Sequence, residues 1–283
     1  MPKYEICDSR NGKGHGPKRS FERIVSLAPA LTEILYALGE ADRVVGVTDS
    51  CDHPAAVHQK PNVACWFEPD LLKLFTLEPD LVLGLETAHR ALEPELERRG
   101  IQVILVNPAS IEAALGVMMM LGELLDAARG AQICVQNLQA RLAELDRQVG
   151  QIPLAERLTV CRVLDLYEDQ LMVAGPLSFQ YDVISRAGGL NVTGQLRKAY
   201  PKVSLARFRQ WDPHTVFFCG NDRQFIPRLL ANPNWHSLQA VQAGRVFQFD
   251  CALTCRTGPR IVDMAELLFK TLYADRGALS PSS

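Results

Sequence analysis

The chain has 283 residues, of which 47% are hydrophobic and 22% are charged, and its formal net charge is −2. This length suits two domains of ordinary size, and either half is long enough to bury a core. The charge balance excludes nucleic acid as a main partner, because proteins that bind it carry a basic excess. No apolar run approaches the ~18 residues of a membrane-spanning helix.

Residues 1–22 form a polar lead-in. It holds the only basic cluster of the chain, Lys13, Lys18 and Arg19, which is interleaved with glycines and therefore predicts a flexible, solvated loop. No apolar run of the signal-peptide type occurs in it. The sequence as it stands predicts a cytosolic protein, or a periplasmic one if an export signal has been removed.

Strands and helices alternate through residues 23–127, which predicts an N-terminal α/β lobe. Apolar runs of strand length lie at 23–28, 43–47, 80–85 and 101–106. Helical segments separate these runs, the first of them following Pro29 and ending before Gly39. Such alternation is typical of a mainly parallel sheet that is covered by helices on both faces.

One long helix is predicted over residues 128–150. Its apolar positions recur at steps of 3, 4, 3 and 4, which places them on one face: Val135, Leu138, Leu142, Leu145 and Val149. A stiff helical connection of this kind limits the relative motion of the lobes that it joins. The alternation resumes in a second α/β lobe over residues 151–275, with strands expected at 157–166, 171–174, 215–219 and 245–249, and a disordered tail follows at 276–283.

In open α/β sheets, ligands bind beyond the carboxyl ends of the strands. The polar, sulfur-bearing and aromatic residues that follow predicted strands are therefore candidates for a ligand site. In the first lobe these are Thr48, Asp49, Cys51, Glu86, Thr87, His89 and Arg90. In the second lobe they are Tyr167, Phe179, Asn221, Asp222, Cys251 and Cys255.

The chain contains eight cysteines. An even count is compatible with disulfides in an exported protein, but a chain of this size does not need them. Cys134, on the long helix, and Cys161, inside a strand, are interpreted as packing residues.

The five cysteines that fall near predicted strand ends are candidate ligands for a soft metal or a metal cofactor: Cys51, Cys65, Cys219, Cys251 and Cys255. Ordinary buried thiols remain the alternative, since no pair has CxxC spacing and Cys251-x3-Cys255 is the nearest approach to it. We expect Cys51, Cys65 and at least one of Cys251 and Cys255 to converge as free thiols.

Several segments in order resemble the helical-backbone metal receptor family, the cobalamin-, haem- and iron-siderophore-binding proteins of bacterial import systems. They are RIVSLAPALTEILYALG (23–39), RVVGVTDSCDHP (43–54), LFTLEPDLVLG (74–84), NWHSLQAVQAGRVFQFD (234–250) and RTGPRIVDMAELL (256–268). The Cys51-Asp52-His53-Pro54 run and Trp66 are most similar to the cobalamin-binding branch. The resemblance implies two Rossmann-like lobes, one backbone helix and a ligand in the interlobe cleft.

The resemblance adds Trp66, Phe67 and the loop near Tyr200 as walls for a broad, flat macrocycle. The ligand-binding residues predicted in this way are Cys51, Asp52, Trp66, Phe67, Thr87, His89, Arg90, Phe179, Tyr200, Cys255 and Arg256. Cobalamin or another corrinoid is the expected ligand. Haem, an iron-siderophore and a cysteine-held iron–sulfur or metal centre are the alternatives. His89 is interpreted as a capping or surface histidine, with an axial metal ligand as the alternative.

Two departures from the family pattern concern its partners. Exported members resembling this chain place a glutamate on each lobe to pair with arginines of a permease, and the matching positions here are Leu72 and Ala206. Neither side chain can form a charge-assisted hydrogen bond, which argues against permease docking. The nearby Glu68 and Asp70 are the alternative docking acids. No GxSxG, HExxH, P-loop or GxGxxG motif is present, so we expect a non-catalytic binding protein. A chelatase-like tetrapyrrole enzyme that uses His89 and Glu86 is the rival, supported by fold analogy alone.

Overall fold

The computed structural model describes residues 20–274. Within them the chain divides into two compact units. Unit 1 holds the residues up to Asn107 together with Val117–Cys134, and unit 2 holds Pro108–Gly116 together with the residues from Val135 onward. The basic cluster of the lead-in and the predicted tail lie outside the described residues.

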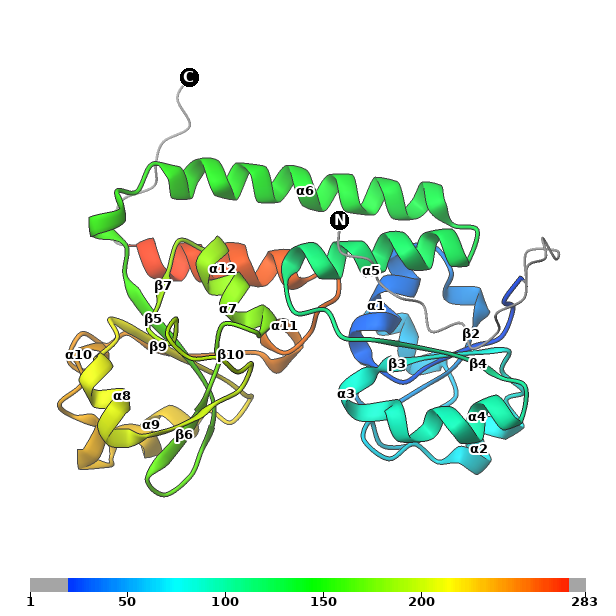
Figure 1. The fold of residues 1–283 in the computed structure, drawn as a ribbon, viewed down its shortest axis with the longest axis horizontal. Coiled ribbons are helices and arrows are strands. Elements are labelled where there is room, and N and C mark those ends of the chain that lie inside the picture. The colour runs from blue at the N-terminus through cyan, green and yellow to red at the C-terminus, as the bar shows by residue number, and fades with distance from the viewer. Residues whose placement is uncertain (1–19, 275–283) are drawn as a thin grey trace. The chain divides into compact units, whose positions relative to one another are not determined.

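Unit 1 is built on a four-stranded sheet in which every pair of neighbours is parallel, as the alternation predicted (Figure 1). The strand order is β2-β1-β3-β4, with β1 at Ile24–Ser26, β2 at Val44–Val47, β3 at Leu81–Leu85 and β4 at Gln102–Val106. Strands β1 and β3 occupy the centre and are almost fully buried, which their uninterrupted apolar sequences explain. The helices are α1 Pro29–Ala37, α2 Leu71–Thr76, α3 Glu86–His89 and α4 Glu93–Arg98.

Unit 2 contains a six-stranded sheet of order β10-β9-β5-β6-β8, with β7 paired to β5. The strands are β5 Thr159–Leu166, β6 Gln170–Val173, β7 Leu190–Asn191, β8 Lys202–Ser204, β9 Thr215–Cys219 and β10 Val246–Phe249. Strands β5, β9 and β10 are parallel, whereas β6 is antiparallel to both β5 and β8. The connection from β5 to β6 is too short for a crossover, so these two strands form a hairpin inside a mainly parallel arrangement.

The helices of unit 2 surround this sheet. They are α7 Phe179–Arg186, α8 Leu205–Trp211, α9 Phe225–Leu230, α10 Gln239–Gln242, α11 Cys251–Thr254 and α12 Ile261–Tyr273. Helix α11 is a single turn that the sequence did not predict. Short 3-10 turns complete the chain at 41–43, 55–59, 90–92, 154–156 and 233–235. Among residues 20–274, no helix has the length and apolar character that crossing a membrane requires.

Helices α5 Ile111–Leu124 and α6 Ala128–Gly150 carry the chain between the units. Helix α6, the long green helix of Figure 1, has 23 residues and confirms the predicted helix with its buried apolar stripe. In unit 2 it is fastened to α12 by Arg141, whose guanidinium lies 2.5 Å from Asp263 and 2.7 Å from Glu266. The predicted domain boundaries, with the first lobe ending at residue 127 and the second beginning at residue 151, stay predictions.

Candidate functional site

In unit 1, the carboxyl ends of β2 and β3 carry a short closed loop. An antiparallel bridge between Ala64 and Pro69 closes it at its base, so that residues 65–68 project from the bridge. Ala64 has a positive φ of 75°, which lets the chain turn sharply there. The amide of Asp49, just after β2, donates to the carbonyl of Ala64 over 3.1 Å. The loop is therefore attached to the edge of the sheet where ligands of open α/β folds bind.

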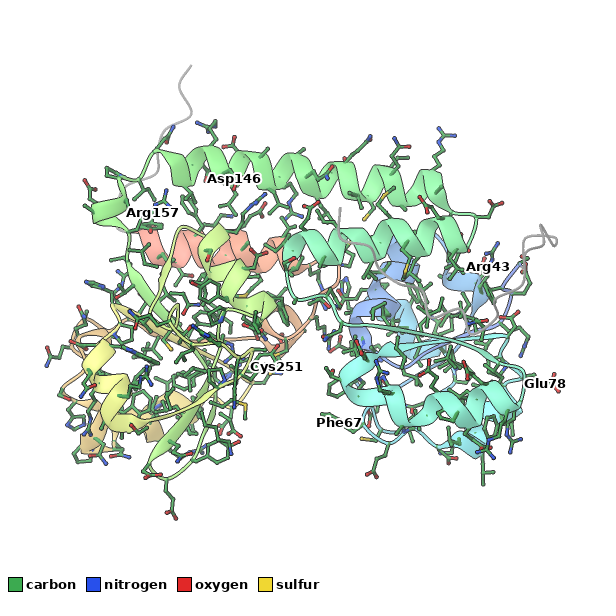
Figure 2. The ribbon with its side chains drawn as sticks, viewed as in Figure 1. Arg43, Phe67, Glu78, Asp146, Arg157 and Cys251 are labelled. Atoms are coloured by element: carbon green, nitrogen blue, oxygen red, sulfur yellow. The ribbon has the colours of Figure 1, made fainter. Side chains whose placement is uncertain are left out.

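The closed loop presents two aromatic rings. The centroids of Trp66 and Phe67 are 4.0 Å apart, with their planes tilted by 57°. Phe67, labelled in Figure 2, is 63% exposed, whereas Trp66 is half-buried. The indole Nε1 of Trp66 is buried and has no hydrogen-bond partner among the described residues. A buried indole N–H usually finds an acceptor, so this donor is an unsatisfied group beside an exposed aromatic surface.

His89 fixes the position of the closed loop through a hydrogen bond to its backbone. It is completely buried at the end of α3. Its Nδ1 accepts a hydrogen bond from the amide of Leu85 over 2.9 Å, which makes Nε2 the protonated nitrogen and the donor to the Trp66 carbonyl at 2.8 Å. Burial lowers the pKa of His89, and the hydrogen bond to Trp66 offsets only part of that effect. With both nitrogens engaged, the geometry favours the capping interpretation over an axial metal ligand.

The other predicted residues of unit 1 are dispersed around this loop. Cys51 is buried, and its thiol lies 3.2 Å from the hydroxyl of Thr32 and 3.4 Å from that of Thr48. Cys65 is exposed, as are Asp52 and Thr87. Arg90 forms an ion pair with Glu86 on the surface of α3.

In unit 2, three of the predicted cysteines come together. Strands β9 and β10 are paired so that Cys219 lies opposite Phe249, two residues before α11 begins. Cys251 and Cys255 stand four positions apart along that single helical turn and therefore share a face. The sulfurs of Cys219, Cys251 and Cys255 all lie within 4.8 Å of one another, and they form the one such group of three potential metal ligands in the described chain. Cys51 and Cys65 do not belong to this group, and their expected convergence with it stays a prediction.

A buried arginine lies beside the three-cysteine cluster. Arg162, in the centre of β5, is only 1% exposed. Its Nη2 lies 3.7 Å from the sulfur of Cys255, its Nη1 donates to the carbonyl of Val163, and its Nε is buried without a partner among residues 20–274. A buried guanidinium needs a nearby negative charge, because removing it from water is costly. The sequence did not single out Arg162, since one basic residue within an apolar strand gives no motif.

The cysteines themselves supply that charge. The thiol of Cys255 donates to Cys219 over 3.4 Å, and this hydrogen bond together with Arg162 lowers the pKa of Cys219 to about 5, although burial acts in the opposite direction. Burial and the neighbouring Cys219 raise the pKa of Cys251 to about 11. The hydrogen bond to Cys219 and burial raise the pKa of Cys255 as well. Of the three thiols, Cys219 therefore loses its proton most readily, and it does so beside the guanidinium of Arg162.

The remaining predicted residues of unit 2 lie close to the cluster or within the core. Tyr200 is 42% exposed, its hydroxyl donates to Gln180 over 3.1 Å, and burial of its ring raises its pKa. Cys255 and Arg162 lie near enough for their charges to act on this phenol. Phe179 is buried at the start of α7, and Arg256 directly follows Cys255.

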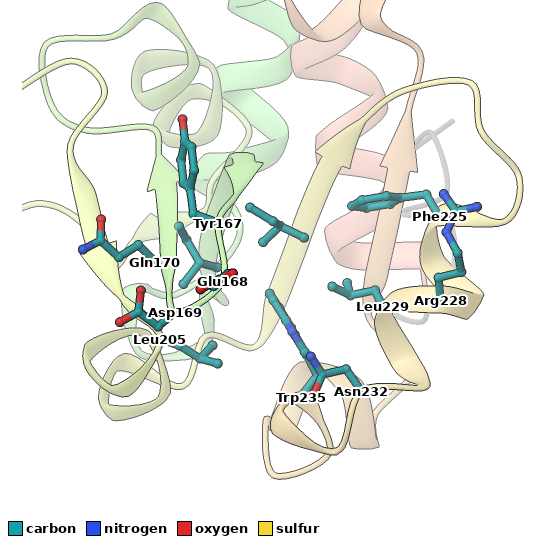
Figure 3. Close-up of a pocket in the computed structure, with 12 residues that line it drawn as sticks. Tyr167, Glu168, Asp169, Gln170, Leu205, Phe225, Arg228, Leu229, Asn232 and Trp235 are labelled. Carbon is teal, nitrogen blue, oxygen red and sulfur yellow. The ribbon is translucent and has the colours of Figure 1, made fainter.

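A pocket of about 410 Å³ opens elsewhere in unit 2 (Figure 3). The turn residues Tyr167, Glu168 and Asp169 line one side of it, and Phe225 of α9 and Trp235 line the other. Its volume is that of a small-molecule site. Of the strand-end candidates, only Tyr167 contributes to its wall, and the three-cysteine cluster does not. The sequence does not indicate this pocket, because its walls combine the β5–β6 hairpin with Leu205 and with residues between Phe225 and Trp235, which lie far away along the chain.

Comparison with known proteins gives one consistent class. The sequence model of a family described as periplasmic binding protein matches residues 24–252. An uncharacterised ABC transporter substrate-binding lipoprotein of Bacillus subtilis (strain 168) is 27% identical over 263 residues, covering 91% of this chain and 82% of the relative. The vitamin B12-binding protein of Photorhabdus laumondii is 27% identical over 253 residues, covering 88% of this chain and 87% of that protein. The crystal structure of a periplasmic haem-binding protein from Pseudomonas aeruginosa has a TM-score of 0.80 at 25% identity, covering 93% of this chain and 95% of that one.

Proposed function

The chain belongs to the periplasmic binding protein family, and we propose that it binds cobalamin or a closely related corrinoid. Proteins of this class are substrate-binding components of ABC transporters rather than enzymes, which removes the chelatase alternative. The general class is therefore a non-catalytic solute-binding protein. The choice of a corrinoid among the solutes of that class is our proposal.

The observation that carries the proposal is the aromatic pair on the closed loop of unit 1. Phe67 exposes 63% of its surface beside Trp66, and such an apolar surface is suited to the face of a large macrocycle. The vitamin B12-binding protein of Photorhabdus laumondii, similar over most of its length, favours a corrinoid for this role.

The other predicted contacts are part of the same proposal. In unit 1 they are Cys51, Asp52, Thr87 and Arg90, of which the exposed Asp52, Thr87 and Arg90 are accessible to a ligand. In unit 2 they are Phe179, Tyr200, Cys255 and Arg256. His89 takes the part of a positioning residue, because it reaches Trp66 through the backbone carbonyl and is itself buried.

The positions expected to dock with a permease do not carry the acids found in exported members that resemble this chain. Leu72, at the expected docking position of unit 1, is 77% exposed and apolar, and Ala206 in unit 2 is exposed and uncharged. Neither supports a charge pair with a permease. We therefore propose ligand storage or transfer with weak permease docking. The periplasmic and lipoprotein names of the relatives favour the exported alternative over the cytosolic one.

The test is a titration of the full chain with cyanocobalamin. Calorimetry measures the affinity, and the absorbance of the protein after removal of free ligand measures the retained corrinoid. Trp66→Ala is expected to weaken binding by about 1–3 kcal/mol, or roughly 5- to 150-fold, through lost stacking and burial. Trp211→Ala is the matched control, because it removes another half-buried indole, which lies on α8 outside the proposed contacts. Equal affinity of Trp66→Ala and the parent chain would contradict the assigned contact.

A parallel titration with haemin separates the corrinoid from the haem alternative, which the Pseudomonas aeruginosa structure represents. Retention of haem but not of cyanocobalamin would overturn the corrinoid proposal and leave the solute-binding class intact. The expected result is that the protein retains cyanocobalamin and that cyanocobalamin displaces haem from the protein in competition.

A further inference from the structure

The three-cysteine cluster of unit 2 is a built arrangement rather than an accident of spacing. Its members come from the end of β9 and from both ends of the single turn α11, and the β9–β10 register sets their distance. All three sulfurs lie within 4.8 Å of one another, and those of Cys219 and Cys255 are 3.4 Å apart. Cys251 and Cys255 are exposed, so the cluster is reached from solvent.

This spacing matches the demands of a thiophilic metal ion. A tetrahedral Zn²⁺ with Zn–S bonds of about 2.3 Å holds its sulfurs about 3.8 Å apart. Small changes in side-chain torsion angles would bring three sulfurs from their present separations to that value. Three protein ligands leave the fourth tetrahedral position for water or another small ligand.

The charges around the cluster give a second, independent argument. Three thiolates and one divalent ion carry a net charge of −1, and the buried guanidinium of Arg162 would neutralise it. The Nη2 of Arg162 already reaches Cys255, and its buried Nε has no partner within the described chain. Outer contacts of this kind orient metal ligands and increase their affinity for the ion.

We propose that Cys219, Cys251 and Cys255 form a binding site for one thiophilic divalent metal ion, with Arg162 as the compensating charge beside it. On binding, the thiols that are still protonated release their protons to solvent, and the ion takes up three thiolate ligands. The site lies within unit 2 and shares Cys255 with the proposed corrinoid contacts, so its test uses the metal ion alone.

The test uses Co²⁺ as a spectroscopic probe on the full chain, freed of metal and handled without oxygen. One Co²⁺ per chain is expected, with thiolate-to-cobalt charge-transfer bands and the visible bands of a tetrahedral ion, and Zn²⁺ should displace it. Serine variants of the three cysteines should each lose affinity by more than the roughly 10- to 100-fold that loss of an outer-shell partner costs. Arg162→Met should fall within that smaller range. Cys134→Ser, on helix α6, is the matched control and should bind as the parent chain does.

Circular dichroism identifies any variant that fails to fold. Because Cys251 is exposed, Cys251→Ser is expected to fold and to test the proposal even if the other serine variants do not. Absence of the charge-transfer bands in the parent chain would overturn the proposal, as would unchanged Co²⁺ affinity in Cys251→Ser. A disulfide between Cys219 and Cys255, trapped by acid quenching and alkylation of intact cells, would also overturn it. None of these results bears on cyanocobalamin binding to Trp66 and Phe67.

Discussion

The Nε2 of His89 donates a hydrogen bond to the backbone carbonyl of Trp66 over 2.8 Å, and its Nδ1 accepts from Leu85 over 2.9 Å. One buried imidazole thus connects the loop after β2 to the turn after β3. Since the bond is made to the backbone of Trp66, the loop keeps its position whatever side chain it presents.

Replacing His89 with alanine should destabilise unit 1 and weaken corrinoid binding together. The change leaves the Leu85 amide and the Trp66 carbonyl without partners inside the protein, and we expect the free energy of unfolding to fall by about 2–3 kcal/mol. Urea denaturation followed by circular dichroism measures this loss. His89→Gln, which retains one donor for the Trp66 carbonyl, should lose less, and equal losses in the two variants would contradict the assigned role of that bond.

The lowered pKa of His89 predicts a loss of stability in mild acid. Burial keeps the imidazole neutral in the folded chain, while the unfolded chain takes up a proton as the pH falls through about 6.5. The unfolded state therefore binds more protons below that pH, so its free energy falls relative to the folded state. Above about 6.5 the two states are equally neutral and the contribution of His89 is fully retained.

The measurement is the urea midpoint of the parent chain and of His89→Gln at pH 7.5 and at pH 5.5. The parent chain should lose more stability than the variant over this interval, because the variant lacks the titrating group while other groups are shared. Identical losses in the two proteins would show that His89 is protonated equally in the folded and unfolded chains.

The contact of α6 with α12 predicts a modest, salt-sensitive contribution to stability. Arg141 pairs with both Asp263 and Glu266, and their interactions raise its pKa. All three side chains are partly exposed, so Arg141→Ala should cost only about 1 kcal/mol, less at high salt. Arg147→Ala removes a more exposed pair, with Glu144, and should leave the urea midpoint unchanged. A larger effect of Arg147→Ala than of Arg141→Ala would contradict this prediction.

Cys219 should remain reactive toward iodoacetamide in mildly acidic solution. Its pKa of about 5, set by the Cys255 hydrogen bond and by Arg162, keeps it in the thiolate form at pH 6. In metal-free protein, its alkylation rate should change little from pH 8 to pH 6 and then fall as the pH passes about 5. Peptide mapping by mass spectrometry follows this site, with glutathione as the external thiol. A decline in parallel with glutathione would show an ordinary thiol at position 219.

Much of the fold could be predicted because its signals are local. The predicted strands and the long helix appear in the structure where the apolar runs and the 3.6-residue stripe place them. The family resemblance gave the class of the protein from segments spread over the whole chain. The antiparallel pairing of β5 with β6 was not predicted. The few residues between the two predicted strands already excluded a parallel crossover.

The site was harder to predict because its contacts are not local. Cys251 and Cys255 are near each other in sequence, but only the β9–β10 register brings Cys219 to them. Arg162 is the one basic residue of β5 and has no spacing signal, although its buried charge lies beside the cluster. Likewise, 23 residues separate His89 from the carbonyl of Trp66.

The bridge between Ala64 and Pro69 has a consequence for how ligand preference changes between related proteins. Since the bridge and the backbone bond from His89 fix the path of the chain, the exposed side chains of Cys65, Phe67 and Glu68 can be exchanged without disturbing the sheet. At these exposed positions the segment can thus carry aromatic, polar or charged side chains while its backbone conformation stays the same. Grafting such a segment from a haem-binding relative would transfer its surface chemistry while conserving the fold of unit 1.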